Sequence, residues 1–213
     1  MTSRRAETGR ADRPGTRRRR LAVLLSGRGS NFEAIASAVD HGTIPDAEIV
    51  AVISDVAEAP GLSRAKQRGL PAFSVDRGGP RSRADREAEI LQILERARPD
   101  LICLAGYMRL LSPGFVERYR DRILNIHPAL LPKFPGLDAQ RRALEAGEEV
   151  SGCTVHFVDE GTDTGPIVLQ KTVPVRSEDT VDTLSARILE QEHAAYPEAI
   201  ARVLSELEKR SGP

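Results

Sequence analysis

The chain of 213 residues is 40% hydrophobic and 29% charged, the composition of an ordinary soluble protein long enough to bury one core. No apolar run approaches the roughly 20 residues that cross a membrane as a helix, so we exclude a membrane-spanning protein. The first twenty residues lack the apolar segment of a signal peptide, and we therefore expect a cytoplasmic protein.

Charge is distributed unevenly along the chain. Residues 1–20 hold eight arginines against Glu7 and Asp12, a net charge of +6. The whole chain has 31 basic and 31 acidic residues, so residues 21–213 carry −6. The Arg-rich segment has no aromatic residue or apolar face with which to bind nucleic acid or lipid. We expect residues 1–20 to be a disordered tail and residues 21–208 to form one domain, whose acidic surface does not suit nucleic acid.

The first half of the chain alternates between buried strands and helices. Apolar runs of strand length occupy residues 21–26, 49–53, 72–75 and 101–105. Helices are predicted after the first three runs. Apolar residues with helical spacing indicate them at residues 32–39 and 82–97, and a segment rich in Ala, Arg and Lys that ends before Gly69 indicates one at about 60–68. This order of elements predicts a Rossmann-like, doubly wound α/β fold, in which a mostly parallel sheet has helices on both faces.

The pattern changes after residue 120. Strand-like runs then follow more closely, at residues 122–127, 151–158 and 167–173, with one short helix at about 137–146. Closely spaced strands join more easily in antiparallel order, so we expect the sheet to become mixed towards its C-terminal part. A last helix is predicted over about 179–208, with a break near Pro197.

A glycine turn, Gly27-Arg28-Gly29-Ser30-Asn31, joins the first strand to the first helix. Free backbone N–H groups and the helix dipole at such a turn favour an anion. Phe32 replaces the third glycine of a dinucleotide-binding motif, and the Gly-Lys-Ser/Thr of a P-loop is missing. The turn therefore favours a simple phosphomonoester over ATP or a dinucleotide. The alternative is a tight turn in which Asn31 caps the helix.

Asn125 and His127 lie two residues apart at the end of an apolar run, so in a strand their side chains point to the same side. Three prolines at 128, 132 and 135 keep the next segment out of regular structure. An amide donor next to a titratable imidazole, where a strand ends, suggests a reaction site. The alternative is a turn in which both side chains only bind backbone groups.

His156 and Asp163 are further candidates for acid–base chemistry. His156 lies in an alternating strand-like run and, taken alone, is best interpreted as a core histidine or one that supports a site. Asp163 lies in the acidic loop 159–165, where an Asx turn is its alternative role. Beside an imidazole, its carboxylate would raise the imidazole pKa and favour imidazolium near neutral pH. Cys103 and Cys153 form no CxxC, and we interpret both as buried hydrophobic residues.

The chain resembles the folate-dependent formyltransferases in four motifs that occur in the same order: residues 27–31, 105–112, 125–132 and 163–166. The similarity extends from about residue 21 to 205. Within that superfamily, the glycine turn, the segment 127–136 and Gln191-Glu192-His193 are most similar to the phosphoribosylglycinamide formyltransferase family.

The resemblance implies roles for residues at matching positions. It places the phosphate of a ribonucleotide on Gly29, Ser30 and Asn31, and the glycinamide or ribose end against residues 189–192, chiefly Glu192. The residues implied to contact the formylfolate are Arg83, Met108, Arg109, Leu110 and Leu111, with Asn125 between the two substrates and the loop from Asp159 to Asp163 around the pterin. Two positions depart from the pattern, since Leu189 stands where some relatives have a polar residue and Asp138 where relatives have His.

The activity implied is transfer of the formyl group of 10-formyltetrahydrofolate to the amine of N1-(5-phospho-D-ribosyl)glycinamide, a step of purine biosynthesis. Asn125 and protonated His127 would donate hydrogen bonds to the tetrahedral oxyanion, and Asp163 would keep His127 protonated. No metal is required. We expect a monomer or homodimer whose partners are these two small molecules, with no nucleic acid or membrane.

Related activities remain as alternatives. A formyltetrahydrofolate hydrolase shares the Asn, His and Asp, but that family carries an additional N-terminal regulatory domain, and only twenty residues precede the first strand here. A methionyl-tRNA formyltransferase would need a C-terminal tRNA-binding domain, and the phosphate-type glycine turn disfavours a sugar-nucleotide formyltransferase. The alternative outside enzymes is a non-catalytic nucleotide-binding protein that has kept the fold.

Overall fold

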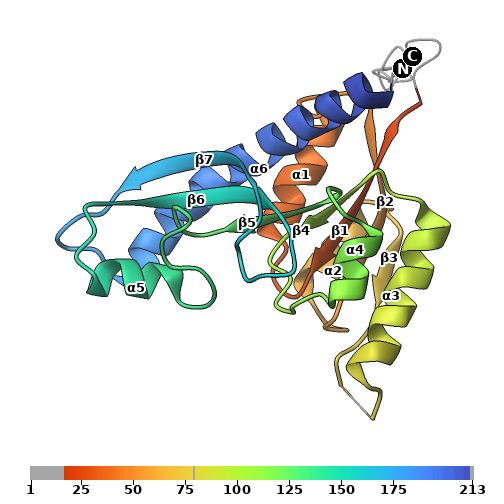
Figure 1. The fold of residues 1–213 in the computed structure, drawn as a ribbon, viewed down its shortest axis with the longest axis horizontal. Helices are drawn as coiled ribbons and strands as arrows, with labels where there is room; N and C mark the ends of the chain where they lie inside the picture. Colours follow the sequence, from red (N-terminus) through yellow and green to blue (C-terminus); the bar gives the residue numbers. More distant parts are fainter. Residues whose placement is uncertain (1–16, 79, 212–213) are drawn as a thin grey trace, which may run out of the picture.

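A seven-stranded sheet with helices on both faces forms the framework of the computed structural model, which describes residues 17–78 and 80–211 (Figure 1). The strands are β1 (Arg19–Leu25), β2 (Ala47–Ser54), β3 (Ala72–Ser74), β4 (Leu101–Leu104), β5 (Ile123–His127), β6 (Val150–Phe157) and β7 (Ile167–Pro174). The helices are α1 (Ser30–Asp40), α2 (Pro60–Gln67), α3 (Arg83–Ala97), α4 (Pro113–Arg118), α5 (Ala139–Glu145) and α6 (Val181–Ser211).

The strand order across the sheet is β3-β2-β1-β4-β5-β6-β7. The first five strands of the chain are parallel, whereas β6 runs antiparallel to β5 and β7 antiparallel to β6. The predicted fold, a doubly wound α/β sheet that becomes mixed towards its C-terminal part, is confirmed. The order reverses between β1 and β4, which is the place where such sheets usually bind ligands.

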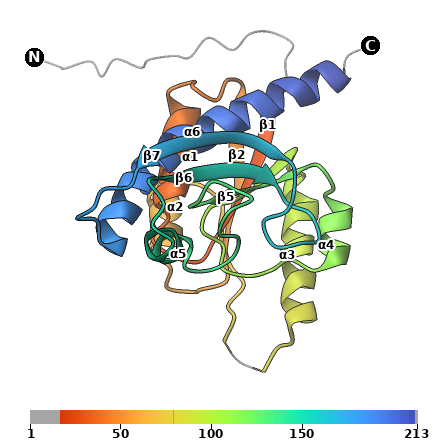
Figure 2. The ribbon, with the colours of Figure 1, turned by 60° about the vertical axis from the view of Figure 1, so that its left-hand side comes forward.

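Alternate residues of β1 divide the core into two layers. Leu21, Val23 and Leu25 pack with apolar residues of α1, α2 and α6, while Ala22 and Leu24 pack with those of α3 and α4. All five side chains are fully buried, as expected for a central strand that is covered on both faces. Figure 2 shows α3 and α4 on one side of the sheet, and α1 and α2 on the other.

The first strand begins at Arg19, two residues earlier than predicted, so the last two residues of the predicted tail belong to the sheet. Their backbone is held by hydrogen bonds, from Arg19 N–H to the Asp46 carbonyl (2.6 Å) and from Arg20 N–H to the Asp100 carboxylate (2.8 Å). The Arg20 guanidinium also bonds to Glu48. Residues 1–16 of the predicted tail lie outside the described residues.

Helix α4 was not predicted, although it carries a recognisable start signal. Ser112 caps it by accepting a hydrogen bond from Phe115 N–H, and Pro113 occupies its first position. With six residues it is too short to show helical periodicity in the sequence.

The break expected near Pro197 was wrong, because α6 continues through that residue to Ser211. A proline inside a helix removes one backbone hydrogen bond. Here its neighbours Tyr196, Ala199 and Ile200 are fully buried against the core, and this packing outweighs the loss. The Tyr196 hydroxyl donates to the carbonyls of Leu104 (3.0 Å) and Leu124 (2.9 Å) and so ties α6 to β4 and β5.

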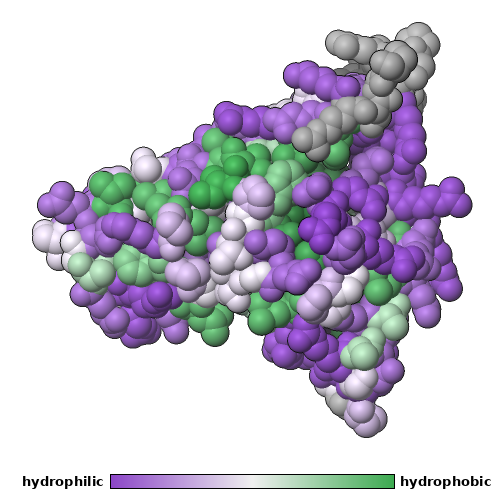
Figure 3. Space-filling view, viewed as in Figure 1, coloured by the Kyte–Doolittle hydropathy of each residue, from purple (hydrophilic) through white to green (hydrophobic). Residues whose placement is uncertain are grey.

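The face drawn in Figure 3 is mostly hydrophilic, with hydrophobic residues over the region of β6 and β7, where Val150 and Ile167 are exposed. None of the helices in the described part of the chain is long and apolar enough to cross a membrane. Cys103 and Cys153 are free and fully buried, as predicted.

Candidate active site

Several of the predicted site residues lie at or just after the carboxyl ends of the parallel strands. The glycine turn follows β1, residues 105–111 follow β4, and His127 is the last residue of β5. In parallel α/β sheets this edge is the usual place for ligands. The fold thus brings together segments that are up to about 100 residues apart in the sequence.

The antiparallel pairing of β5 with β6 places a second histidine beside Asn125. Asn125 pairs with His156 and His127 with Thr154 across the two strands. Asn125 Nδ2 lies 3.2 Å from His156 Nε2, and the other ring nitrogen of His156 contacts the Phe157 carbonyl at 2.8 Å. His156 is 2% exposed, which fits its interpretation as a buried histidine that supports the site.

Asp163 is the common partner of these groups. Its Oδ2 lies 3.2 Å from His127 Nδ1 and accepts a hydrogen bond from Gly136 N–H at 2.8 Å. Its Oδ1 lies 3.4 Å from Asn125 Nδ2 and 3.5 Å from His156 Nε2. Asn125, His127 and His156 therefore meet at one carboxylate, although the first two lie more than 30 positions from Asp163 in the chain.

The Asp163 carboxyl is ionised at neutral pH. Burial raises its pKa, but hydrogen bonds with His156 and the Gly136 N–H, and the charge of His127, outweigh that effect and hold the pKa at about 2. Its backbone has a φ of 56°, in the left-handed region that Asp tolerates better than most residues. The site therefore has a fixed negative charge beside two imidazoles.

The expected rise in the pKa of His127 was wrong in its net direction. Burial lowers the pKa of this imidazole, and the opposing effects of Asp163 and the Phe134 carbonyl do not fully compensate. The ring is 5% exposed, so charging it costs solvation. Both ring nitrogens nevertheless face oxygen acceptors, since Nε2 lies 2.8 Å from the Phe134 carbonyl. Only the protonated ring, imidazolium, can donate to both acceptors. The hydrogen-bond geometry therefore favours protonated His127, whereas burial favours the neutral ring.

The irregular segment after β5 is held by side chains of β6 and β7. Thr154 Oγ1 donates to the Ala129 carbonyl (2.6 Å) and accepts from Leu131 N–H (3.0 Å). Gln170 Nε2 donates to both Thr154 Oγ1 (2.8 Å) and the Leu131 carbonyl (3.0 Å). These bonds fix the path of the loop that carries Phe134 over His127.

The glycine turn is pressed against the start of α2. Gly29 has a φ of +77°, and a Cβ built on it would lie 2.6 Å from the Gly61 Cα. Gly61 N–H donates to the Gly27 carbonyl at 3.1 Å. Gly29 is the N-cap residue of α1, and no side chain caps this helix. The alternative role of Asn31 as a helix cap was therefore wrong.

Asn31 instead reaches across to α6. Its Nδ2 donates to Glu192 Oε2 at 2.7 Å, and both residues are buried. Burial raises the pKa of Glu192 to about 7, although the hydrogen bond from Asn31 opposes this rise. The Oδ1 atom of Asn31 is buried without a hydrogen-bond partner within the described chain. Two of the residues expected to bind the nucleotide are therefore in direct contact.

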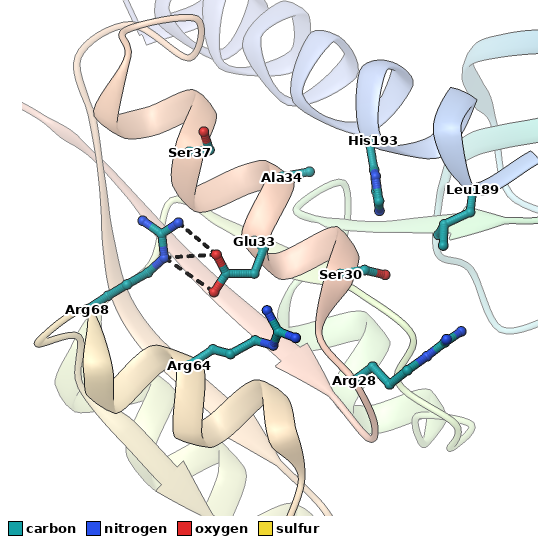
Figure 4. A pocket seen from close by; sticks show the side chains of 9 residues that line it. All are labelled: Arg28, Ser30, Glu33, Ala34, Ser37, Arg64, Arg68, Leu189 and His193. Atoms are coloured by element: carbon teal, nitrogen blue, oxygen red, sulfur yellow. Dashed lines mark hydrogen bonds and ion pairs between the residues drawn. The ribbon is translucent and has the colours of Figure 1, made fainter. Parts of the chain in front are cut away.

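A cleft of about 600 Å³ lies between α1, α2 and α6, next to this pair. Its lining includes Arg28, Ser30, Glu33, Arg64, Leu189 and His193, which Figure 4 shows from close by. Ser30 was expected here, whereas Arg64 and His193 were not singled out by the sequence. Leu189 does line the cleft and adds an apolar side chain to it.

A second cleft, of about 330 Å³, contains much of the expected folate-binding set. Its lining includes Arg77, Arg83, Arg86, Met108, Arg109 and Leu110. Leu111, Asn125, Asp159 and Asp163 do not line it. Leu111 packs against the apolar core instead, and Asp159 accepts hydrogen bonds from Gly161 N–H (3.0 Å) and Thr164 Oγ1 (2.7 Å) within its own loop.

Sequence reasoning missed two polar residues that follow strand ends. Ser26 Oγ accepts a hydrogen bond from Met108 N–H at 2.9 Å, and Asp55 Oδ2 lies 3.4 Å from Arg109 Nε. Asp55 is 3% exposed and lines the second cleft. Their places directly after β1 and β2 were the available signal. Asp138, in contrast, is exposed, and its side chain makes no hydrogen bond within the described residues.

Comparisons with known proteins identify the family to which the chain is similar. The family model described as formyl transferase matches residues 19–200. The phosphoribosylglycinamide formyltransferase of Escherichia coli (strain K12) is 45% identical over 181 residues, which cover 85% of this chain and 85% of that protein. The crystal structure of glycinamide ribonucleotide transformylase 1 from Symbiobacterium toebii has a TM-score of 0.83 and 49% sequence identity, covering 86% of each chain.

Longer relatives also match. The trifunctional purine biosynthetic protein adenosine-3 of Drosophila melanogaster is 50% identical over 190 residues, or 89% of this chain. The match covers 14% of that protein, so the chain spans about a seventh of its length.

Proposed function

This chain belongs to the formyl transferase family, and from that premise we propose that it transfers the formyl group of 10-formyltetrahydrofolate to the amine of N1-(5-phospho-D-ribosyl)glycinamide. The products are the N-formyl compound and tetrahydrofolate, within purine biosynthesis. The printed names of the Escherichia coli relative and of the Symbiobacterium toebii structure support the choice of amine substrate.

The observation that carries the proposal is the arrangement around Asp163. At the end of β5, an amide donor (Asn125) lies 3.4 Å and an imidazole (His127) 3.2 Å from the ionised carboxylate of Asp163. Acyl transfer to an amine needs hydrogen-bond donors for a developing oxyanion and a route for one proton. Asn125 and His127 supply the donors, and Asp163 supplies the charge that supports a protonated imidazole.

The reaction proceeds by attack of the substrate amine on the formyl carbon. A C–N bond forms, and the carbonyl electrons move to oxygen to give a tetrahedral oxyanion. Collapse of the oxyanion breaks the bond from carbon to N10 of the folate, and the proton lost by the amine goes to that nitrogen. Donors that are preorganised at the oxyanion each contribute about 3–4 kcal/mol to lowering the barrier.

Both ring nitrogens of His127 contact oxygen acceptors in the structure. Nδ1 contacts Asp163 and Nε2 contacts the Phe134 carbonyl, so neither ring nitrogen is free to donate to an oxyanion. One of these contacts must open in the reactive complex. The contact with Phe134 is the one to open, because the contact with Asp163 stabilises the charge that the mechanism uses.

The two clefts provide places for the two substrates. The cleft beside the glycine turn suits the phosphorylated amine. Of its proposed binding residues, Ser30 lines the cleft, and Gly29, Asn31 and Glu192 lie next to it. The second cleft suits the formylfolate, because its arginines match the carboxylates of the glutamate moiety. Of the predicted folate contacts, Arg83, Met108, Arg109 and Leu110 line it, and the residues that do not line it are Leu111, Asn125, Asp159 and Asp163.

One assay separates this proposal from its rivals. The protein is mixed with 10-formyltetrahydrofolate, with and without glycinamide ribonucleotide, and release of tetrahydrofolate is followed. Release that requires the amine supports the transferase. Equal release without the amine indicates a formyltetrahydrofolate hydrolase, and no release in either mixture indicates a non-catalytic nucleotide-binding protein.

The role of Asp163 is tested by Asp163→Asn. The variant keeps the shape of the side chain but loses its charge, so we expect kcat to fall about 100-fold or more while the KM for the nucleotide stays within a few-fold. Asp121→Asn is a matched control, because Asp121 is exposed and has a similar φ of 59°. A near-normal kcat in Asp163→Asn would remove this carboxylate from the mechanism.

Five expectations remain predictions. We propose that residues 19–208 act as one catalytic domain, which now includes the first two residues of β1, and that residues 1–16 are dispensable for activity. We also propose that the protein works in the cytoplasm, as a monomer or a homodimer, without a metal. In the described part of the chain, no three His, Cys, Asp or Glu side chains are grouped so as to hold a metal ion.

A further inference from the structure

The residues so far placed around the phosphate carry no positive charge. Gly29, Ser30 and Asn31 offer neutral donors, and Glu192 on the far side is an acid. A phosphate monoester carries about −1.5 to −2 charges at pH 7. Binding it tightly in preference to an uncharged group requires cations within reach.

The cleft beside the glycine turn contains three arginines and one acid. Arg28, Arg64 and Arg68 against Glu33 give a formal net charge of +2, which matches a phosphate dianion. His193 adds no charge at neutral pH, because burial lowers its pKa. Leu189, which faces the cleft from α6, adds none either.

Arg68 is already occupied by carboxylates. It donates to Glu33 at 2.7 Å and to Asp40 at 2.8 Å, and Figure 4 shows the contacts with Glu33. Within residues 17–78 and 80–211, the guanidinium groups of Arg28 and Arg64 have no hydrogen-bond or ion-pair partner. The cleft therefore holds two arginines whose charge is free for a ligand.

Of these two, Arg64 is the better placed. Gly61 presses against Gly29, with its N–H bonded to the Gly27 carbonyl at 3.1 Å. Residues three apart on a helix share a face, so Arg64 lies on the face of α2 that contacts the glycine turn. In Figure 4 its side chain extends from α2 towards the first turn of α1, whereas Arg28 extends away along the rim.

We propose that Arg64 is a substrate-binding residue, whose guanidinium neutralises the phosphate that the glycine turn holds through its backbone N–H groups. Arg28 adds a second positive charge at the rim. This assignment rests on the proposed function, since it requires a phosphorylated amine as substrate. It also makes α2 part of the nucleotide site, in addition to α1 and α6.

The test compares Arg64→Ala and Arg64→Lys with Lys66→Ala. Lys66 is an exposed cation on the same helix that does not line the cleft, so Lys66→Ala controls for loss of one charge. In steady-state assays, Arg64→Ala should raise the KM for glycinamide ribonucleotide about 10- to 100-fold, the range of charge-assisted hydrogen bonds. Its kcat and its KM for 10-formyltetrahydrofolate should stay within about twofold, and Arg64→Lys should recover part of the loss.

Nucleotide KM values within twofold of each other in Arg64→Ala and the unaltered protein would overturn the assignment. An equally large rise in the nucleotide KM of Lys66→Ala would also overturn the assignment, because the loss of any nearby positive charge would then explain the result. Circular dichroism and thermal unfolding of each variant establish that it is folded, as expected for an exposed residue.

Calorimetric titration with ribose 5-phosphate separates this inference from the proposed function. Absence of amine-dependent folate release refutes the proposed function and leaves the binding measurement valid. Binding that is at least tenfold weaker in Arg64→Ala than in Lys66→Ala then supports a phosphate site that uses Arg64. Equal binding in both variants, or no binding by the unaltered protein, refutes it.

Discussion

The buried carboxyl of Glu192 makes the stability of the protein depend on pH. The residue is 7% exposed and accepts one hydrogen bond, from Asn31 at 2.7 Å. Its pKa is raised from 4.5 to about 7, mainly by burial. Glu192→Gln keeps the shape and the hydrogen-bond acceptor but cannot ionise, so it isolates the cost of burying the charge.

The direction of the effect follows from the two pKa values. Below pH 4.5 the carboxyl is neutral in both folded and unfolded chains, and ionisation costs no stability. Between pH 4.5 and 7 the Glu192 carboxyl ionises in the unfolded chain but stays mostly neutral in the folded protein, so the free energy of unfolding falls as the pH rises. Above pH 7 the loss is complete and amounts to about 3 kcal/mol, since one pKa unit corresponds to about 1.4 kcal/mol.

Urea unfolding at pH 5 and pH 8 measures this loss. Relative to the unaltered protein, Glu192→Gln should gain about 2.5 kcal/mol more stability at pH 8 than at pH 5. Glu190→Gln is the matched control, because Glu190 is exposed on the same helix. That control should change the free energy of unfolding by no more than about 0.5 kcal/mol at either pH.

An equal effect of Glu192→Gln at both pH values would contradict this prediction. It would show that the carboxyl titrates near its ordinary pKa in the folded protein. A stabilising effect at pH 8 would also mean that the carboxylate is kept for binding at a cost in stability, which fits its proposed place beside the nucleotide.

Two further predictions concern residues that the sequence did not single out. Tyr196→Phe removes the hydroxyl that bonds to the Leu104 and Leu124 carbonyls. Urea unfolding should show that the free energy of unfolding falls by about 1–2 kcal/mol. An unchanged free energy of unfolding would mean that these carbonyls find other partners. Asp55→Asn removes the charge that faces Arg109, and steady-state assays should show the KM for 10-formyltetrahydrofolate rising about two- to fivefold with the nucleotide KM unchanged. An equal rise in both KM values would argue against a specific role in orienting Arg109.

The strands and most helices were predictable because their signals are local. The continuous apolar run 21–25 becomes a central strand buried on both faces, and the crowding of strands after residue 120 becomes antiparallel pairing. The failures arose where a local signal was short or was overruled. Helix α4 has only six residues, and α6 continues past Pro197 because its neighbours are buried.

The three residues proposed as catalytic were predictable from their motifs, but their contacts were not. Spacing placed Asn125 and His127 on one side of β5, and the resemblance paired them with Asp163. Their distances, and the presence of His156 in the same cluster, depend on the register between β5 and β6. The pKa of His127 also escaped prediction, because the sequence shows the carboxylate but not how deeply the ring is buried.

Residue types and short spacings alone were enough to predict the order of elements, the glycine turn after the first strand, and the groups that we propose as catalytic. These depend on residue types and on spacings of a few positions, which chain connectivity imposes directly. Which charged groups have no partner became apparent only in the folded structure, since partners such as Glu33 for Arg68 and Asn31 for Glu192 come from distant elements. That is why Arg64, an ordinary surface residue in the sequence, stands out only when α2 is packed against the glycine turn.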